Sequence, residues 1–339
     1  MRPSQLDSLT SAGDPQLAPN GKHVAYVVSN IDMKDNKYRS RIWVVDTGGE
    51  AAGRPLSSGE HADGQPRWSP DGSMLAFSST RKTDEKGKKE STLHVLPFDQ
   101  PGETAVLHTS AEPMHSLSFS PDGNWLAFAM RDRSSDYDVD DPARREPRKI
   151  ENLNFMLNGE GFISDRPSNI WVAALDGSGE VRNLTPGRHE CSSPAWLADS
   201  SGIAFAYNPL LARDTSQICT VSLGDIGEDS SALSMTALTN LDMPCYAPVV
   251  SPSGDTVALL GDDDHETMFQ NVHVGVVDAG SDAADPAWVS KAVDRNWAPT
   301  MVAQSPTWTE DGLFAAMEDR GNVHLYQIDP TGGEPSIVL

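Results

Sequence analysis

The sequence contains little cysteine, and none of it lies at a metal-binding spacing. The 339 residues include only Cys191, Cys219 and Cys245, which are far apart, and no C-x-x-C motif occurs. An odd number of widely spaced cysteines predicts neither a disulfide framework nor a zinc knuckle. We therefore expect reduced thiols, most of them buried.

Long apolar runs and positive charge are also scarce. The N-terminal segment MRPSQLDSLTSAGDP has no apolar core of signal-peptide length, and no later run approaches the roughly 20 apolar residues of a membrane span. There are 26 Lys and Arg residues against 49 Asp and Glu, a formal net charge of −23. Such a surface repels phosphate backbones and anionic lipids, which argues against nucleic acid and membranes as partners. These features favour a cytoplasmic protein, unless a leader has been removed.

Catalytic motifs are missing from the sequence as well. There is no G-x-S-x-G, in which glycines allow a strained turn to expose a serine hydroxyl, and no G-x-x-x-x-G-K-[ST] phosphate loop. His94, His273 and His324 occupy equivalent places on predicted strands, which favours a structural role for each. We therefore expect no catalytic residue in this chain.

Two acidic stretches resemble parts of metal sites. Residues 262–266, DDDHE, follow a predicted strand, where a solvated loop is expected. Three aspartates at 136, 138 and 140 have the opening spacing of a calcium loop, but Asp141 and Pro147 stand where an EF-hand requires Gly and Glu. We predict no metal and no cofactor.

Turn-forming residues, in contrast, are abundant, with 27 glycines and 24 prolines. In PRWSPDGSMLAFSS, at 66–79, a Pro-Asp-Gly turn separates two apolar runs, the pattern of an antiparallel β-hairpin. Related segments occur six times, with the turn glycines Gly21, Gly72, Gly123, Gly202, Gly254 and Gly312. These glycines are 51, 51, 79, 52 and 58 residues apart.

Each hairpin is followed by a third apolar segment, such as IWVVD at 42–46, and by a short fourth one, such as RNLT at 182–185. Four strands in roughly 50 residues is the repeat of a β-propeller blade, whereas separate β-sandwich domains would repeat nearer 100 residues. We predict an all-β fold, a β-propeller with six recognisable four-stranded blades, either closed or an incomplete seven-bladed ring. Residues 1–339 form one domain, with repeats at about 14–62, 63–113, 114–190, 191–244, 245–300 and 301–339.

The spacing of 79 places an insertion at 131–169, in the third blade. Its first half is densely charged, and its second half carries apolar residues and is expected to be ordered. Asn158, Glu160 and Arg166 are the residues that we expect to contact a substrate or partner there. Glu160 can meet a peptide amine, and Arg166 can pair with a carboxylate through its planar fork. A surface loop without such a role is the alternative.

The repeated SPDGxxLAF hairpin, with its IWVVD and LT segments, resembles the propeller repeat of the prolyl oligopeptidase family of serine peptidases. The third-blade segment RKIENLNFMLNGEGFISDRPSNIWV resembles the acylaminoacyl-peptidase branch of that family. This resemblance implies a seven-bladed propeller covering an α/β-hydrolase domain that carries the catalytic Ser, Asp and His. With six repeats and no G-x-S-x-G, the chain resembles the N-terminal propeller part alone, truncated or encoded separately.

The resemblance also implies a role and partners. The propeller would admit short peptides to a C-terminal α/β-hydrolase domain and exclude folded proteins, without being catalytic itself. It leaves open whether the chain is a homo-oligomer. The same hairpin also resembles the periplasmic propeller of the Tol system, so a free-standing propeller that binds protein partners is the alternative function, and a purely structural scaffold is a third.

Overall fold

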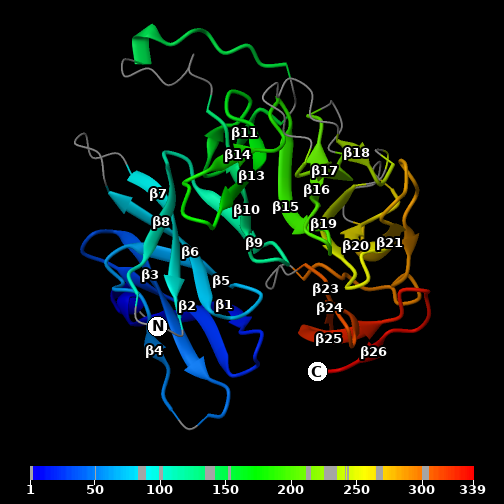
Figure 1. The fold of residues 1–339 in the computed structure, drawn as a ribbon, viewed down its shortest axis with the longest axis horizontal. Helices are drawn as coiled ribbons and strands as arrows, with labels where there is room; N and C mark the ends of the chain where they lie inside the picture. Colours follow the sequence, from blue (N-terminus) through cyan, green and yellow to red (C-terminus); the bar gives the residue numbers. More distant parts are fainter. Residues whose placement is uncertain are drawn as a thin grey trace. The chain divides into compact units, whose positions relative to one another are not determined.

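The computed structural model describes residues 3–49, 51–82, 89–98, 102–133, 142–151, 154–210, 215–224, 235–240, 242, 244–264, 270–299 and 305–339. The chain divides into two compact units. Unit 1 consists of Met1–Met130 and Trp171–Arg182, and unit 2 consists of Arg131–Ile170 and Asn183–Leu339. Antiparallel β-sheets make up both units, so the predicted all-β fold is confirmed (Figure 1).

Unit 1 begins with a short 3-10 helix, η1 (Pro3–Ser8), and an eight-stranded sheet. Its strands are β1 (Thr10–Leu17), β2 (His23–Asp32), β3 (Lys37–Asp46), β4 (Arg54–Pro55), β5 (Ala62–Trp68), β6 (Met74–Lys82), β7 (Lys89–Pro97) and β8 (Ala105–Ser110). A parallel bridge between Ser40 and Ala62 joins β1–β4 to β5–β8. The sheet therefore consists of two predicted four-stranded repeats.

The next sheet has the order β14-β13-β10-β9 and contains the predicted insertion. Its strands are β9 (Met114–Phe119), β10 (Trp125–Arg131), β13 (Ser168–Ala174) and β14 (Val181–Asn183). Between β10 and β13 lie a 3-10 turn, η2 (Pro142–Arg144), and a small hairpin of β11 (Met156–Leu157) and β12 (Gly161–Phe162). The insertion is thus an excursion between the second and third strands of this sheet.

Unit 2 contains three further four-stranded sheets, each in chain order (Figure 1). Their strands are β15 (Glu190–Trp196), β16 (Gly202–Asn208), β17 (Gln217–Ser222) and β18 (Thr236–Ala237), then β19 (Cys245–Val250), β20 (Thr256–Gly261), β21 (His273–Asp278) and β22 (Ala287–Trp288), then β23 (Thr307–Thr309), β24 (Gly312–Asp319), β25 (Asn322–Ile328) and β26 (Ser336–Ile337). All six predicted hairpins are therefore antiparallel strand pairs. The number of blades in the ring and the repeat boundaries stay predictions.

The Ser-Pro-Asp-Gly turns explain why the hairpins form. In the turn from β5 to β6, the Asp71 carboxylate accepts hydrogen bonds from Ser69 Oγ at 2.6 Å and from the Ser73 amide at 3.0 Å. Ser69 Oγ in turn accepts a hydrogen bond from the Met74 amide at 2.9 Å, and Gly72 has a left-handed φ of 74°. The side chains thus satisfy the turn's own backbone groups, which fixes the hairpin locally.

A feature that the sequence did not reveal recurs in the first strand of five repeats. Each of these strands bulges at a non-glycine residue with a left-handed φ: Asp14 (48°), Gln65 (55°), Ser116 (55°), Ser193 (55°) and Ala247 (52°). Such a bulge re-aims a side chain away from the regular alternation of the strand. Gln65 uses this to bond to Met114 O at 2.8 Å and to the Ser116 amide at 2.7 Å, which links β5 to β9 within unit 1.

The core of each unit is formed by the inner strands of its sheets. Phe128 and Phe205, two of the hairpin aromatics, are fully buried. The three cysteines are buried and unpaired, as predicted, and burial raises the pKa of Cys219 to about 11, so its thiol stays protonated and unreactive. His94 is 1% exposed, which agrees with a structural role.

Within the described residues, no helix is long and apolar enough to cross a membrane. The same part of the chain holds no group of three or more His, Cys, Asp or Glu side chains that could bind a metal ion. The aspartates at 136, 138, 140 and 141 and the His265-Glu266 pair lie outside the described residues.

Candidate functional site

The second half of the insertion forms an ordered hairpin. At the β11–β12 turn, the Glu160 amide bonds to Leu157 O at 3.2 Å, and Gly159 and Gly161 have φ values of 85° and 81° that favour glycine. Ile163, which follows β12, is 2% exposed, and its amide bonds to Phe155 O at 2.9 Å. The buried Ile163 thus anchors the hairpin, and Glu160 lies at its tip.

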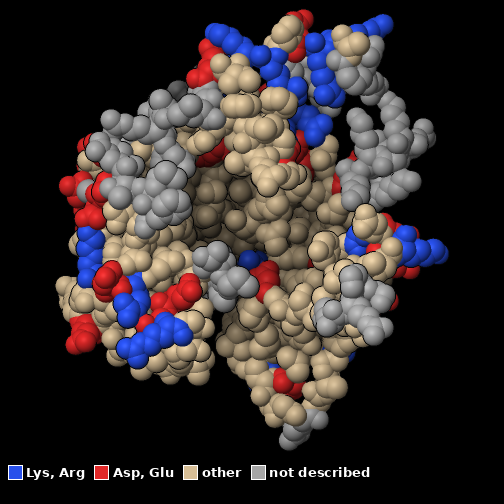
Figure 2. Space-filling model, turned by 180° about the vertical axis from the view of Figure 1, so that it is seen from behind, with Lys and Arg blue, Asp and Glu red and all other residues tan. Residues whose placement is uncertain are grey.

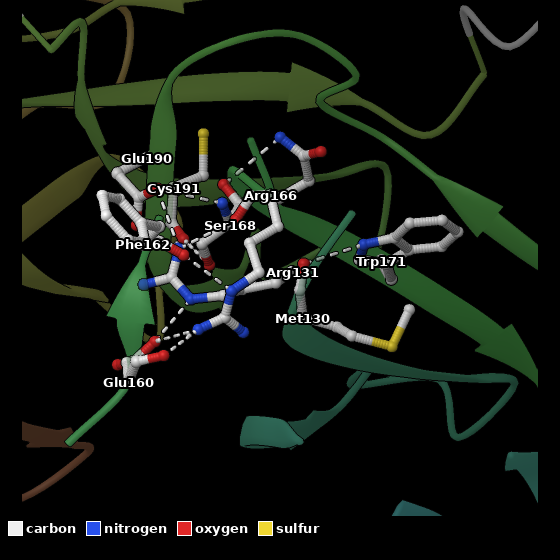
Figure 3. Close-up of polar contacts among 10 residues, drawn as sticks. Met130, Arg131, Glu160, Phe162, Arg166, Ser168, Trp171, Glu190 and Cys191 are labelled. Atoms are coloured by element: carbon white, nitrogen blue, oxygen red, sulfur yellow. Dashed lines mark hydrogen bonds and ion pairs between the residues drawn. The ribbon is translucent and has the colours of Figure 1, made fainter. Parts of the chain in front are cut away.

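Arg131, the last residue of β10, joins this hairpin to the next sheet. Its Nε donates to Glu160 Oε2 at 2.5 Å, and one terminal nitrogen donates to both carboxylate oxygens of Glu190 at 2.9 and 3.0 Å. Figure 3 shows the Arg131 guanidinium among these two carboxylates and the Arg166 side chain. One cation from the end of β10 therefore holds the tip of the insertion and the start of β15.

Arg166 completes this cluster from the segment after β12. It donates to Phe162 O at 2.9 Å and to Glu160 O at 2.5 Å, while its own carbonyl accepts a bond from Arg131 at 3.1 Å. Because Arg166 donates these hydrogen bonds to main-chain carbonyl oxygens, it fixes the backbone on both sides of the hairpin tip. We call Arg131, Glu160, Arg166 and Glu190 the Arg131 cluster.

Two of the three site residues predicted from the sequence thus come together in the structure. Glu160 and Arg166 belong to the Arg131 cluster, whereas Asn158 lies exposed in the β11–β12 turn and makes no polar contact with another described residue. Arg131 and Glu190 were missed. For Arg131 a local signal was available, because it is a charged residue at the end of the apolar strand β10, where a burial cost has to be compensated. Glu190 begins β15, ECSSPAW, which is not an apolar run and gives no such signal.

Burial and charge act against each other in the Arg131 cluster. Burial raises the pKa of Glu190, although Arg131 and the Ser168 amide favour its ionised form. Burial disfavours the charged form of Arg131, but the bond to Glu160 and the charge of Glu190 outweigh it and raise the pKa of Arg131. We infer that Arg131 and Glu190 form an ion pair at neutral pH, in which desolvation disfavours the charged form of Glu190.

Beside this cluster the insertion lines an open pocket of about 330 Å³, which we call the arginine pocket. It is lined by Arg133, Arg145, Arg148, Glu160, Phe162, Asp165 and Arg166. Arg148 donates to Asp165 Oδ2 at 2.9 Å and lies over the Phe162 ring at 4.4 Å. On the face shown in Figure 2, basic side chains gather along the upper end, although the chain as a whole is acidic.

Unit 1 contains a larger cavity, of about 510 Å³, at the outer ends of β2 and β3. Arg39 lies in its wall, but its guanidinium already pairs with Asp32 at 2.6 Å and with Asp35 at 2.8 Å. These two pairs satisfy the charge of Arg39, although Lys34 and Arg41 also line this cavity.

Comparison with known proteins gives one extended match in sequence. The chain is 28% identical to the uncharacterized peptidase YuxL of Bacillus subtilis over 218 residues, which are 62% of this chain and 32% of YuxL. No family model matches the chain. The chain therefore spans about a third of the length of this curated relative.

Solved structures show the same fold over nearly the whole chain. The acylaminoacyl peptidase of Pyrococcus horikoshii is matched over 98% of this chain and 47% of its own, with a TM-score of 0.69 and 17% identity. The β-propeller domain of the Trilobed protease from Pyrococcus furiosus is matched over 98% of this chain and 84% of its own, with a TM-score of 0.60 and 17% identity. At these identities the likeness shows the fold. The chain thus has the β-propeller fold, and the resemblance to the propeller part of acylaminoacyl-peptidase-like enzymes that the sequence indicated is confirmed.

Proposed function

We propose that the chain is the substrate-gating propeller of a serine peptidase that acts on short peptides. The observation that carries this proposal is the match of 98% of the chain to less than half of an acylaminoacyl peptidase. The sequence likeness to a peptidase, YuxL, points the same way. The alternative function, a free-standing Tol-like propeller that binds protein partners, stays a prediction. No feature of the described residues favours it.

In this proposal the propeller contributes selection and positioning rather than chemistry. The serine that forms the acyl-enzyme, and the His and Asp that assist it, belong to an α/β-hydrolase partner domain. The propeller holds the peptide by contacts outside the reacting bond and excludes folded proteins. Such remote contacts can raise the rate by orienting the substrate.

The Arg131 cluster suits a positioning role. The Glu160 side chain is 45% exposed, so its carboxylate can meet a cationic group, whereas Arg131 is only 10% exposed and holds Glu160 from beneath. A preorganised carboxylate loses little side-chain entropy on binding. We assign Glu160 to the amine or amide N–H groups of a peptide, with Arg131 as its positioning residue.

The test compares this chain with the whole product of its gene. We expect the purified chain to show no hydrolysis of acyl-peptides or peptide anilides, and the whole product to cleave short peptides far faster than a folded protein that contains the same sequence. Hydrolysis by the chain alone, abolished by one serine substitution within it, would contradict the proposal. So would a whole product that cleaves folded and short substrates equally well.

A further inference from the structure

The larger cavity of unit 1 is an open pocket with an unpaired guanidinium in its wall. We call it the Arg41 pocket, and it is lined by Asp7, Gly59 and residues 28, 30–34 and 39–41. Arg41 is half-buried, and it makes no hydrogen bond or ion pair with another described residue. A charged group that is partly withdrawn from water without a partner is costly. A ligand that accepts hydrogen bonds from Arg41 would offset this cost.

Gly59 explains how the guanidinium fits into the wall. It is buried and has a left-handed φ of 76°. A Cβ atom at this position would overlap Nε and Nη2 of Arg41 and lie only 2.6 Å from its Cζ. The guanidinium therefore packs directly on the Gly59 backbone, an approach that only glycine allows. The chain thus holds the charged group in place without giving it an acceptor.

The charges around Arg39 are balanced among themselves. Arg39 pairs with Asp32 at 2.6 Å and with Asp35 at 2.8 Å, and Asp35 also pairs with Lys37 at 3.1 Å. Glu60 adds a negative charge that acts on Arg39, but it does not line the pocket. These groups therefore leave the charge of Arg41 unmatched.

Three charged side chains of the wall stay unpaired among the described residues: Asp7, Lys34 and Arg41. Two positive charges thus face one negative charge. Asn30 adds neutral donors, because its Oδ1 accepts a hydrogen bond from Thr10 Oγ1 at 2.9 Å while its amide N–H groups bond to no described residue. The pocket therefore offers more donors and more positive charge than its own acceptors use.

The pocket also has an apolar part, which consists of Val28, Ile31 and Met33. Met33 is 52% exposed, although an apolar side chain gains free energy when it leaves water. A ligand that covers Met33 while it bonds to Arg41 needs an apolar body beside its charged group.

We propose that the Arg41 pocket binds a small carboxylate that carries an apolar substituent. A guanidinium presents two parallel N–H groups that match the two oxygens of a carboxylate. The single excess positive charge matches one negative charge, whereas a second one is repelled by a chain of net charge −23. The volume of about 510 Å³ is in the range of small-molecule sites. The pocket lies wholly in unit 1 and does not depend on the proposed function.

The carboxylate can come from a free carboxylic acid or from the C-terminal residue of a peptide, and the experiment separates these sources. The full chain is titrated at constant salt with hexanoate, with Ac-Ala-Leu that has a free C-terminus, with the neutral hexanamide and with inorganic phosphate. We expect hexanoate to bind about tenfold more tightly than hexanamide, since hydrogen bonds to a charged group are the stronger ones. The tighter of hexanoate and Ac-Ala-Leu identifies the source.

Met33 reports where the ligand binds, because it lines the pocket. Isotope-labelled methionine methyl groups are followed by NMR, and Met33→Leu assigns the Met33 signal. We expect this signal to shift with hexanoate and to saturate with the same dissociation constant as binding measured by calorimetry. A Met33 signal that does not move up to about 10 mM hexanoate would overturn the proposal.

Arg41→Gln removes the guanidinium without breaking a bond to another described residue. We expect this variant to bind hexanoate about fivefold to tenfold more weakly. The matched control is Lys22→Gln, which removes one positive charge from an exposed side chain just before β2, whereas the pocket lies at the end of that strand. Lys22→Gln should bind like the unaltered chain, and equal weakening by both variants would reduce the effect to net charge and overturn the proposal.

Gly59→Ala tests the position of the guanidinium while every charge is kept. The added Cβ displaces Arg41, so hexanoate binding should weaken about as much as in Arg41→Gln. The urea midpoint of this variant is measured alongside to show that it is folded. Unchanged hexanoate binding in the folded Gly59→Ala variant would count against the site.

Two further outcomes would overturn the proposal: hexanamide that binds as tightly as hexanoate, or phosphate that binds more tightly than either carboxylate. These failures leave the proposed function intact if the whole gene product still cleaves short peptides. Conversely, hexanoate binding that Arg41→Gln weakens supports the Arg41 pocket even if the whole gene product shows no peptidase activity.

Discussion

Arg131, whose side chain is only 10% exposed, has to satisfy two carboxylates with a single guanidinium. Replacing it with Met keeps an apolar stem but leaves Glu190, with a side chain 20% exposed, without its cation. We expect Arg131→Met to lower the free energy of unfolding by about 2 kcal/mol at pH 7, measured by urea unfolding. Arg320→Met, at an exposed side chain, is the matched control and should stay within about 0.5 kcal/mol of the unaltered chain.

The same substitution should have a characteristic pH dependence. Burial raises the pKa of Glu190 above its ordinary value of 4.5 even beside Arg131, and loss of Arg131 raises it further. A carboxyl with a raised pKa in the folded state costs stability as pH rises through that pKa. The difference between Arg131→Met and the unaltered chain should therefore be small near pH 4 and grow toward pH 7, and a constant difference would contradict this role of Glu190.

At the scale of the strand, the bulges produce side-chain contacts that the hydrophobic pattern of the sequence does not predict. Gln65 bonds to Ser78 Oγ at 3.1 Å besides its two bonds to β9, so truncating it leaves several polar groups without a partner. We expect Gln65→Ala to cost about 2 kcal/mol of unfolding free energy. Gln327→Ala, at a half-buried Gln on β25 whose side chain makes one hydrogen bond, to Asp311 O, should cost less than about 1 kcal/mol. Equal losses would show that the Gln65 contacts to β9 contribute little.

The hairpin turns predict how the fold responds to acid. Hydrogen bonds from Ser69 Oγ and from the Ser73 backbone and hydroxyl lower the pKa of Asp71 below its ordinary 3.8. The ionised carboxylate therefore stabilises the folded state above that value, and this contribution is lost as pH falls through the lowered pKa. Asp71→Asn should flatten the decline of the urea midpoint below about pH 4, whereas Asp282→Asn, exposed and outside these turns, should keep the original slope.

These elements also show what could be predicted from sequence. The hairpins were predictable because each depends on a few adjacent residues, such as Ser69 to Gly72, and because the pattern repeats. Glu160 and Arg166 could be named as candidates because both lie in one short insertion, and their role stays a prediction. The pairing of Arg131 with Glu190 joins residues 59 positions apart, and the convergence of four arginines on one cavity depends on how the insertion folds back. Neither arrangement produces a periodic pattern in the sequence that could predict it.

At the scale of the whole molecule, repulsion among acidic residues opposes folding. Ion pairs such as Arg295–Asp319, at 2.7 Å, offset only part of this repulsion, because 49 acidic residues face 26 basic ones. Contacts of a few ångströms are screened little by salt, whereas repulsion between distant charges is screened strongly once the Debye length falls to about 10 Å. Salt should therefore weaken the repulsion more than the attraction.

We expect the urea midpoint at pH 7 to rise when NaCl increases from about 0.01 M to about 0.5 M, since the Debye length shrinks from about 30 Å to below 10 Å. Because the chain consists of two compact units, it can unfold in more than one transition. The urea midpoint of each transition should therefore be measured separately, instead of fitting the whole curve to two states. The control is the same titration near pH 4.6, the isoelectric point, where the net charge vanishes and the rise should largely disappear. A midpoint that falls with salt at pH 7 would mean that short-range ion pairs outweigh the net charge, and an equal rise at both pH values would assign the effect to general salt exclusion instead of charge repulsion.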